Sequence, residues 1–199
     1  MILRETEMIG FVEHWIGYLW LAFVIAWWMA AVASKRSVRL QSGGSRLLQS
    51  LLVLIGLIFV FNLGHAITHG WMVRRVVPRT EAWALAGAAL TVAGMLFSVW
   101  ARAVLGRNWS GRVTIKQDHE LILRGPYAFV RHPIYTGMLA ALLGTALVYG
   151  EARCFAGLLI CAFGIWLKSQ TEEQFMMRQF GEQYAHYRQR VRALVPFVL

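Results

Sequence analysis

Charge-free apolar stretches recur along the chain, and each is long enough to cross a lipid bilayer as a helix. Two contain twenty residues and two contain eighteen: Trp15–Ser34, Ala82–Ala101, Leu47–Gly64 and Pro133–Gly150. A helix needs roughly 20 apolar residues to cross the hydrocarbon core, and it makes all of its backbone hydrogen bonds internally. The pattern therefore predicts four membrane-spanning helices.

A fifth apolar stretch, Cys154–Leu167, has only fourteen residues. On length alone it could be a re-entrant or buried helix, but we favour a full span because Lys168 can extend its charged end to the interface. Residues 150–153 have the length of a tight turn between antiparallel helices. We therefore expect an all-α fold: a polytopic helical membrane protein with about five transmembrane helices, a cytoplasmic loop and a C-terminal amphipathic helix.

Polarity along the chain predicts two parts. Residues 1–105 hold three N-terminal transmembrane helices, and residues 106–199, with a cytoplasmic loop, a transmembrane hairpin and a C-terminal helix, would be the catalytic half if the chain is an enzyme. In that last helix five apolar or aromatic residues recur every three or four positions, so they would share one face: Met176, Phe180, Tyr184, Tyr187 and Val191. The face could rest on lipid headgroups or cover a site.

Composition and charge agree with a membrane protein. Hydrophobic residues make up 58% of the chain, more than soluble domains carry. The net charge of +10 is unevenly distributed. With five spans and the N-terminus outside, one side receives only five basic residues: Arg4, Arg74, Arg75, Arg79 and Arg153. The other fifteen Lys and Arg residues fall on the opposite side. Basic residues concentrate in cytoplasmic loops, so the loop before Pro133 and the C-terminus are expected in the cytoplasm, without nucleic acid as a partner.

Two charged pairs are expected to meet at this cytoplasmic face. If the last two spans form an antiparallel hairpin, Arg131 and His132 at the start of one emerge beside Glu172 and Glu173 at the end of the other. Basic residues at a helix N-terminus oppose the helix dipole, which suits the binding of an anion. Simple anchoring at the cytoplasmic membrane surface is the alternative for this basic pair.

Other features carry less chemistry. Gly137, Ala140, Ala141 and Gly144 form a small-residue face, which favours helix packing over close approach of a ligand. His65 and His69 share a helical face but lack a third ligand, so we expect no metal. Cys154 and Cys161 lie in an apolar run, where buried structural cysteines are typical. The chain has no P-loop, dinucleotide-binding glycine motif, H-E-x-x-H or paired C-x-x-C.

Several short motifs in the second half, taken together and in order, resemble the isoprenylcysteine carboxyl methyltransferase family. They are His119-Glu120-Leu121, Gly125-Pro126-Tyr127, Arg131-His132-Pro133-Ile134-Tyr135-Thr136-Gly137, Thr171-Glu172-Glu173 and Phe180-Gly181-Glu182-Gln183-Tyr184, followed by Tyr187. The resemblance covers roughly residues 108–197. It implies an integral membrane enzyme that uses S-adenosyl-L-methionine to methylate a lipophilic acceptor entering from the bilayer.

Carried onto this chain, the resemblance implies a cofactor site formed by His119, Leu121, Gly125, Tyr127, His132, Pro133 and Tyr135 and closed by Glu172 and Glu173. Arg131, Tyr135 and Glu172 would be the catalytic residues. We expect Glu172 and Tyr135 to hold the methionine end and the sulfonium, while Arg131 orients an anionic acceptor. Methyl transfer to a carboxylate or thiolate then needs positioning and charge compensation, without an obligatory general base.

The motifs indicate which cofactor binds, but they do not indicate which acceptor is methylated. Carboxyl O-methylation of an isoprenylcysteine-like substrate is favoured, and phospholipid N-methylation or thiol S-methylation stays open. A non-catalytic membrane module that binds lipid or nucleotide is a second hypothesis. A steroid-reductase-like enzyme with a nicotinamide cofactor is a third, which is disfavoured because it would place a Glu soon after Tyr135-Thr136-Gly137, where this chain has Met138. The sequence leaves the oligomeric state open.

Overall fold

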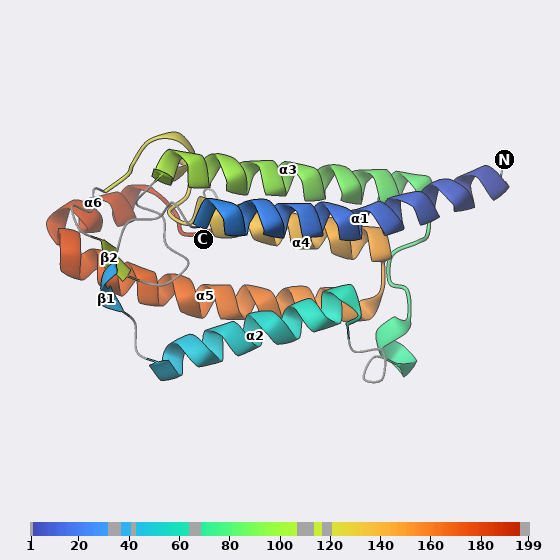
Figure 1. The fold of residues 1–199 in the computed structure, drawn as a ribbon, viewed down its shortest axis with the longest axis horizontal. Coiled ribbons are helices and arrows are strands. Elements are labelled where there is room, and N and C mark those ends of the chain that lie inside the picture. Colours follow the sequence, from blue (N-terminus) through green and yellow to red (C-terminus); the bar gives the residue numbers. More distant parts are fainter. Residues whose placement is uncertain are drawn as a thin grey trace.

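The computed structural model describes residues 2–31, 37–40, 43–63, 69–106, 114–116 and 121–195. Long helices lie side by side along one axis (Figure 1). They are α1 (Ile2–Ala31), α2 (Gly43–Phe61), α3 (Glu81–Leu105), α4 (Pro133–Tyr149) and α5 (Ala152–Phe180). Shorter elements lie toward the ends of this bundle: η1 (Gly70–Val73), η3 (Gly125–Ala128), α6 (Glu182–Arg190), β1 (Ser37–Leu40) and β2 (Thr114–Lys116).

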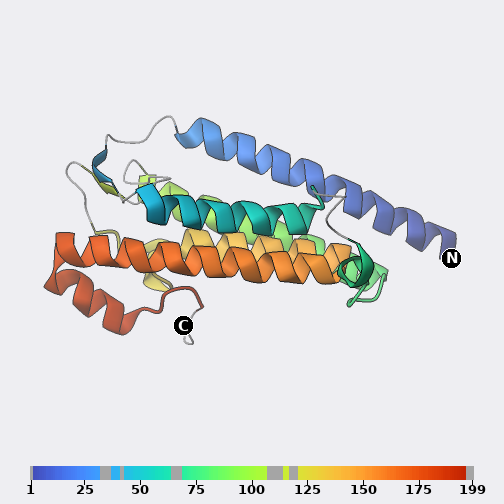
Figure 2. The same ribbon diagram turned by 90° about the horizontal axis from the view of Figure 1, so that it is seen from below.

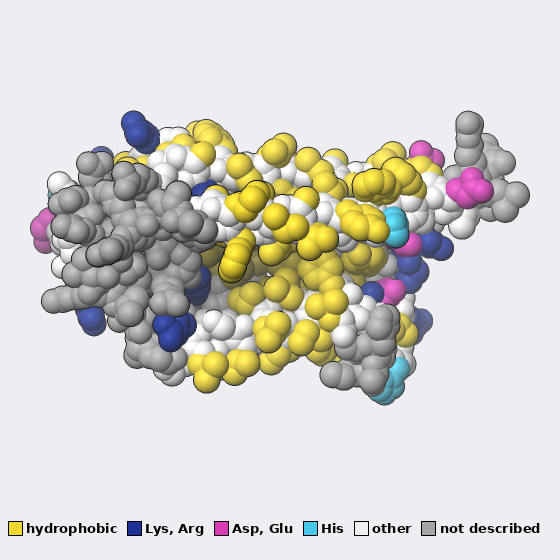
Figure 3. All heavy atoms as spheres, in the orientation of Figure 1, with side chains coloured by type: hydrophobic (Ala, Val, Ile, Leu, Met, Phe, Trp, Pro, Cys, Tyr) yellow, Lys and Arg dark blue, Asp and Glu magenta, His cyan; other side chains and the backbone are white. Residues whose placement is uncertain are grey.

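The helix lengths confirm the predicted fold class of a helical membrane protein. By length and composition, α1, α2, α3 and α5 can each cross a bilayer, and α4, an apolar helix of 17 residues, reaches the lower end of the spanning range. The short stretch Cys154–Leu167 is part of the 29-residue helix α5, which removes the doubt about its length. Hydrophobic side chains cover the middle of the bundle on the face drawn in Figure 3. Trp28 is 78% exposed and Leu159 70%, as expected for groups that face lipid.

Helices α3 and α4 approach so closely that only glycine fits at their contacts. A Cβ atom on Gly94 would lie 2.5 Å from the Gly137 carbonyl oxygen, and one on Gly87 would lie 2.6 Å from that of Gly144. Small residues allow such backbone contact between membrane helices. The small-residue face of α4 therefore packs against α3, as the sequence favoured.

We expect Gly94→Ala to destabilise the protein by about 1–3 kcal/mol, because the new methyl group meets backbone atoms of α4 that have no room to move. Gly17→Ala is the matched control, since nothing lies within 4 Å of a Cβ at that position in α1. Alanine there should be neutral or stabilising by about 0.5–1 kcal/mol through its better helix propensity. Thermal unfolding in detergent measures both, and equal effects of the two substitutions would contradict the close contact.

Helices α2 and α5 form a second close pair. A Cβ on Gly56 would lie 2.6 Å from the Gly157 carbonyl oxygen and 2.4 Å from the Cys161 sulfur, so this cysteine fills the interface. At one end of the pair, the buried Arg153 donates from Nη1 to the carbonyls of Phe59 and Val60 at 2.7 and 2.8 Å. These carbonyls belong to the last turn of α2, where a cation is favourable. Helices from both sides of residue 105 thus pack together, and the predicted division there remains a hypothesis about function.

A small antiparallel sheet, which the sequence analysis did not predict, joins two loops. Strand β1 follows α1 and strand β2 follows α3, with Ser37 opposite Lys116 and Leu40 opposite Thr114. The sheet lies at the same end of the bundle as α6 (Figure 1). Strands β1 and β2 and helix α6 therefore share one end of the bundle.

The expectation of one continuous apolar face from Met176 to Val191 is wrong. The chain breaks at Gly181, where φ is +49°, a conformation that disfavours side chains, and α6 starts in a new direction beside α5 (Figure 2). Tyr184 and Tyr187 are buried, and the Tyr187 hydroxyl donates to the Tyr127 carbonyl at 2.6 Å. Helix α6 therefore packs on the protein with these two rings.

Candidate active site

The start of α4 and the later part of α5 bring the two predicted charged pairs into contact. Arg131 donates to Glu173 Oε1 from Nε at 2.9 Å and from Nη2 at 2.6 Å. His132 lies between the two acids, with Nδ1 3.4 Å from Glu172 Oε2 and Nε2 3.3 Å from Glu173 Oε1. The short connection between α4 and α5 makes them antiparallel, which places these four side chains together. This contact confirms the expected meeting of the basic and acidic pairs.

His132 can donate to both acids only when both of its ring nitrogens carry protons. Ionised carboxylates only accept hydrogen bonds, so an imidazole that donates to two of them must be the cation. Burial lowers the pKa of His132, but hydrogen bonds to Glu172 and Glu173 and their charges outweigh this and raise it above its usual 6.5. The two acids and Arg131 with His132 then form a neutral set of charges.

This protonated His132 predicts a pH dependence of stability. A group whose pKa is higher in the folded than in the unfolded protein stabilises the fold fully below its unfolded pKa of 6.5, and this contribution disappears as pH rises through the folded pKa. We therefore expect the melting temperature in detergent to fall as the pH is raised from below 6.5 through the higher pKa that His132 has in the folded protein. In His132→Gln the fall should be clearly smaller. The same slope in both proteins would show that His132 does not carry the effect.

Aromatic groups complete one side of the cluster. The Tyr135 hydroxyl donates to Glu172 Oε1, and its ring stacks on His132 with centroids 5.7 Å apart. Lys168 Nζ lies 5.4 Å from the centroid of the same ring. Glu172 retains 22% side-chain exposure, against 3% for Glu173 and 7% for His132. Glu172 is therefore the acid of the pair that still has surface for a ligand.

Arg131 has a different environment from the one expected. Besides Glu173, its Nη1 donates to the carbonyls of Arg188 and Val191, and its side chain is only 9% exposed. The backbone N–H groups of Arg131 and His132 donate to the carbonyls of Arg192 and Ala193 at 2.8 and 3.0 Å. Residues 191–194 thus occupy the N-terminal end of α4, where an anion was considered. In this structure Arg131 holds the C-terminal segment.

An apolar cluster that contains Tyr127 lies next to the charged one. Tyr127 is buried against Ala101 and Ile134, and Tyr135 packs on the same group. Burial raises the pKa of Tyr127 above its ordinary 10.0, so the phenol stays protonated. Gly125 has φ of +62°, and a Cβ atom at this position would lie 3.2 Å from a Val104 methyl group, so the position favours glycine. Pro133 is buried at the first position of α4, and Leu121 is half-buried.

Some candidates lie elsewhere. His119 and His65 are outside the described residues. Within the described part of the chain, no group of three His, Cys, Asp or Glu side chains could hold a metal ion. No role at the site was predicted from the sequence for Lys168 or Arg188. Lys168 stands four residues before Glu172, the spacing that brings two helical side chains together, and this signal could have identified it.

Comparisons with known proteins indicate the family of the chain. The family model described as phospholipid methyltransferase matches residues 83–183. A protein-S-isoprenylcysteine O-methyltransferase of Schizosaccharomyces pombe is 33% identical over 99 residues, which are 47% of this chain and 41% of that protein. A probable protein-S-isoprenylcysteine O-methyltransferase of Oryza sativa subsp. indica is 28% identical over 115 residues, 56% of this chain and 60% of that protein. The chain thus spans about half the length of these curated relatives.

A solved structure shows a similar fold. It is the eukaryotic intramembrane Ras methyltransferase, an isoprenylcysteine carboxyl methyltransferase, and it superposes with a TM-score of 0.51 at 21% identity over 81% of this chain and 55% of that chain. At this identity the likeness concerns the fold alone. The motif resemblance to isoprenylcysteine carboxyl methyltransferases is confirmed by the relatives, and the family model covers half of the chain. The chain belongs to the phospholipid methyltransferase family.

Proposed function

We propose that this integral membrane protein is an S-adenosyl-L-methionine-dependent methyltransferase acting on a lipophilic acceptor, with its cofactor site at the Glu172 cluster. The observation that carries the proposal is the partly exposed Glu172 carboxylate, fixed by Tyr135 on one side and His132 on the other. Family membership supports the reaction class. The chain covers only part of the length of these relatives, so their activity is proposed for this chain and not assigned to it.

The side chains at the cluster fit the chemistry of this cofactor. Its methionine part carries an ammonium, a carboxylate and a sulfonium, so a site for it needs acidic, basic and aromatic groups close together. Glu172 offers an acid with exposed surface, Lys168 offers a cation, and Tyr135 offers an aromatic face between them. Tyr127 adds a second ring in the adjoining apolar cluster. When bound, S-adenosyl-L-methionine supplies an electrophilic methyl group.

The chain's residues would act mainly by positioning. The Tyr135 hydroxyl and the His132 ring hold the Glu172 carboxylate in one orientation, so its charge is ready for a cationic ligand without reorganisation. Arg131 is saturated by Glu173 and backbone carbonyls. We therefore revise its proposed role from contact with an anionic acceptor to positioning of Glu173 and of residues 191–194.

Carboxyl O-methylation of an isoprenylcysteine-like acceptor is the reaction that the cluster favours. Both His132 nitrogens face carboxylates, so this imidazole is not available to accept a proton. A carboxylate acceptor is already ionised at neutral pH, whereas the ammonium of a phospholipid amine must first lose a proton. The names of the curated relatives point to the same acceptor, and the exposed apolar helices suit its entry from the bilayer.

A panel of acceptors tests this proposal. Purified protein in detergent is given methyl-labelled cofactor with a prenylated cysteine, a phosphatidylethanolamine or a hydrophobic thiol. We expect label in the prenylcysteine product, released as volatile methanol by alkali because a carboxyl methyl ester hydrolyses. Stable label in phospholipid or thiol would replace this acceptor, and cofactor binding without transfer to any of the three would favour a binding module.

We also propose that the cluster faces the cytoplasm and that the N-terminus lies outside, because the basic residues concentrate at the end of the bundle with α6. Single cysteines introduced as Gln189→Cys and Trp71→Cys, in a chain with Cys154 and Cys161 replaced by Ala, report the two ends. On intact cells a membrane-impermeant maleimide should label position 71 at once and position 189 only after lysis. The reverse pattern would invert the orientation.

A further inference from the structure

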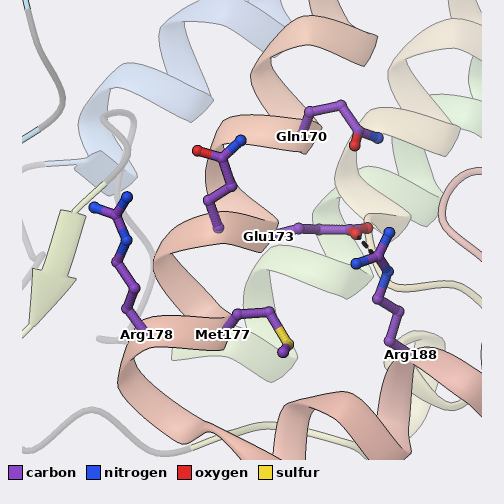
Figure 4. A pocket seen from close by; sticks show the side chains of 6 residues that line it. Gln170, Glu173, Met177, Arg178 and Arg188 are labelled. Carbon is purple, nitrogen blue, oxygen red and sulfur yellow. Dashed lines mark ion pairs between the residues drawn. The ribbon is translucent and has the colours of Figure 1, made fainter.

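A groove lies between α6 and the part of α5 that extends past the apolar stretch. Its volume is about 360 Å³, and it is lined by Gln170, Glu173, Gln174, Met177, Arg178 and Arg188. The first five lie on one face of α5, at spacings of three and four residues, and Arg188 faces them from α6 (Figure 4). The groove borders the Glu172 cluster through Glu173 and through Arg188, whose carbonyl accepts from Arg131.

The groove is basic in effect although it contains an acid. Glu173 Oε1 already accepts from Arg131 and faces His132, so its charge is compensated from the cluster side. On the groove side, Arg188 Nε lies 3.3 Å from Glu173 Oε2, longer than a usual charge-assisted hydrogen bond, and the Arg188 side chain is 52% exposed. This pairing is therefore weak enough for Arg188 to bind another anion.

The other lining groups add hydrogen-bond donors. Arg178 is exposed and lies on the opposite side from Arg188 in Figure 4, and the lining also includes the amide side chains of Gln170 and Gln174. Two guanidinium groups and two amides suit the oxygens of a phosphate, which arginine recognises with its forked donors. The volume is also sufficient for a headgroup-sized ligand.

The depth of the groove indicates which phosphate reaches it. The apolar stretch of α5 ends at Leu167, and Gln170 and Gln174 follow three and seven residues later. At 1.5 Å per residue, Gln170 starts about 5 Å along the helix beyond the hydrocarbon, within the polar headgroup layer, and Gln174 and Arg178 start about 10 and 16 Å beyond it. A lipid phosphate is therefore at the level of the end of the groove that Gln170 lines.

We propose that the groove between α5 and α6 binds the phosphate of an anionic phospholipid through Arg178 and Arg188, assisted by Gln170 and Gln174. Because Arg188 is shared with Glu173, an occupied groove draws this guanidinium away from the charged cluster. The lipid composition of the leaflet would thereby tune the surroundings of Glu173. Phospholipid binding in this groove requires neither the methyl acceptor nor methyl transfer.

Lipid binding to the full-length protein tests the proposal. The protein is reconstituted in phosphatidylcholine nanodiscs with increasing phosphatidylglycerol, and bound lipid is counted by native mass spectrometry. We expect Arg178→Gln with Arg188→Gln to raise the apparent dissociation constant for phosphatidylglycerol at least about fivefold. The control Arg190→Gln with Arg192→Gln removes the same charge from exposed positions outside the groove and should change it less than about twofold. Equal weakening by both pairs would overturn the site.

Two further measurements distinguish loss of lipid binding from unfolding, and a lipid phosphate from a soluble one. Gln174→Glu places a carboxylate in the groove while keeping both arginines, and it should also weaken phosphatidylglycerol binding; unchanged binding would contradict the proposal even if the double variant unfolds. Glycerol phosphate and inorganic phosphate are titrated in phosphatidylcholine nanodiscs. If these bind in an Arg178- and Arg188-dependent way while phosphatidylglycerol does not, the occupant is a soluble phosphate and the lipid assignment is wrong.

Discussion

Glu172→Gln is expected to lower kcat/KM for methyl transfer by roughly 10- to 150-fold, the effect of losing about 1.5–3 kcal/mol from a charge-assisted interaction. Glutamine keeps the shape of the side chain and can still accept from Tyr135, so the loss reports the negative charge. Tyr135→Phe removes only the hydrogen bond that orients Glu172, and we expect a smaller loss of about two- to tenfold.

The matched control for this substitution is Glu182→Gln, which removes the same charge from an exposed position at the start of α6. It should leave kcat/KM within about twofold, because a surface charge contributes little. Steady-state kinetics with the prenylcysteine acceptor gives all three values. If Glu172→Gln and Glu182→Gln have the same activity, Glu172 is not the acid at the cofactor site.

Arg131→Gln is expected to cost about 3–5 kcal/mol of stability, the penalty for breaking the shortest ion pair of the buried Glu173 carboxylate. The substitution removes two hydrogen bonds to Glu173 and two to backbone carbonyls near the C-terminus. The C-terminal segment should then separate from α4 more often, so limited proteolysis after residue 190 should become faster. Thermal unfolding in detergent measures the loss of stability.

The control for Arg131 is Arg124→Gln, an exposed arginine seven residues earlier, which should change stability by less than about 0.5 kcal/mol. A double substitution sharpens the result. Arg131→Gln with Glu173→Gln removes both members of the pair, so it should be more stable than the sum of the two single changes predicts. Additive effects would mean that Arg131 and Glu173 are not energetically coupled.

The sequence predicted the helices and the meeting of charged pairs because both follow from the chain itself. Apolar stretches must be helical in lipid, and a short connection after α4 makes α5 antiparallel, which brings His132 to Glu172 and Glu173. The small-residue face of α4 could likewise be read from Gly137 and Gly144, although its partner α3 could not.

Other features depend on contacts that no local pattern records. The break at Gly181 interrupts a periodicity that otherwise continues from Phe180 to Tyr184, so the pattern alone predicts one helix. The environment of Arg131 depends on the backbone carbonyl groups of Arg188 and Val191. Because every residue has a backbone carbonyl group, the residue types at these positions do not reveal the contact. The pairing of β1 with β2 joins loops more than seventy residues apart. A single sequence considered alone does not reveal such a distant contact.

The location of the cofactor site is the central claim, and a density map of the protein with bound S-adenosylhomocysteine, the demethylated product, tests it most directly. We predict density for its amino-acid part in contact with the Glu172 carboxylate and the Tyr135 ring, with Arg131 still bound to Glu173. Density in the α5–α6 groove, or elsewhere in the protein with the Glu172 cluster free, would contradict the account.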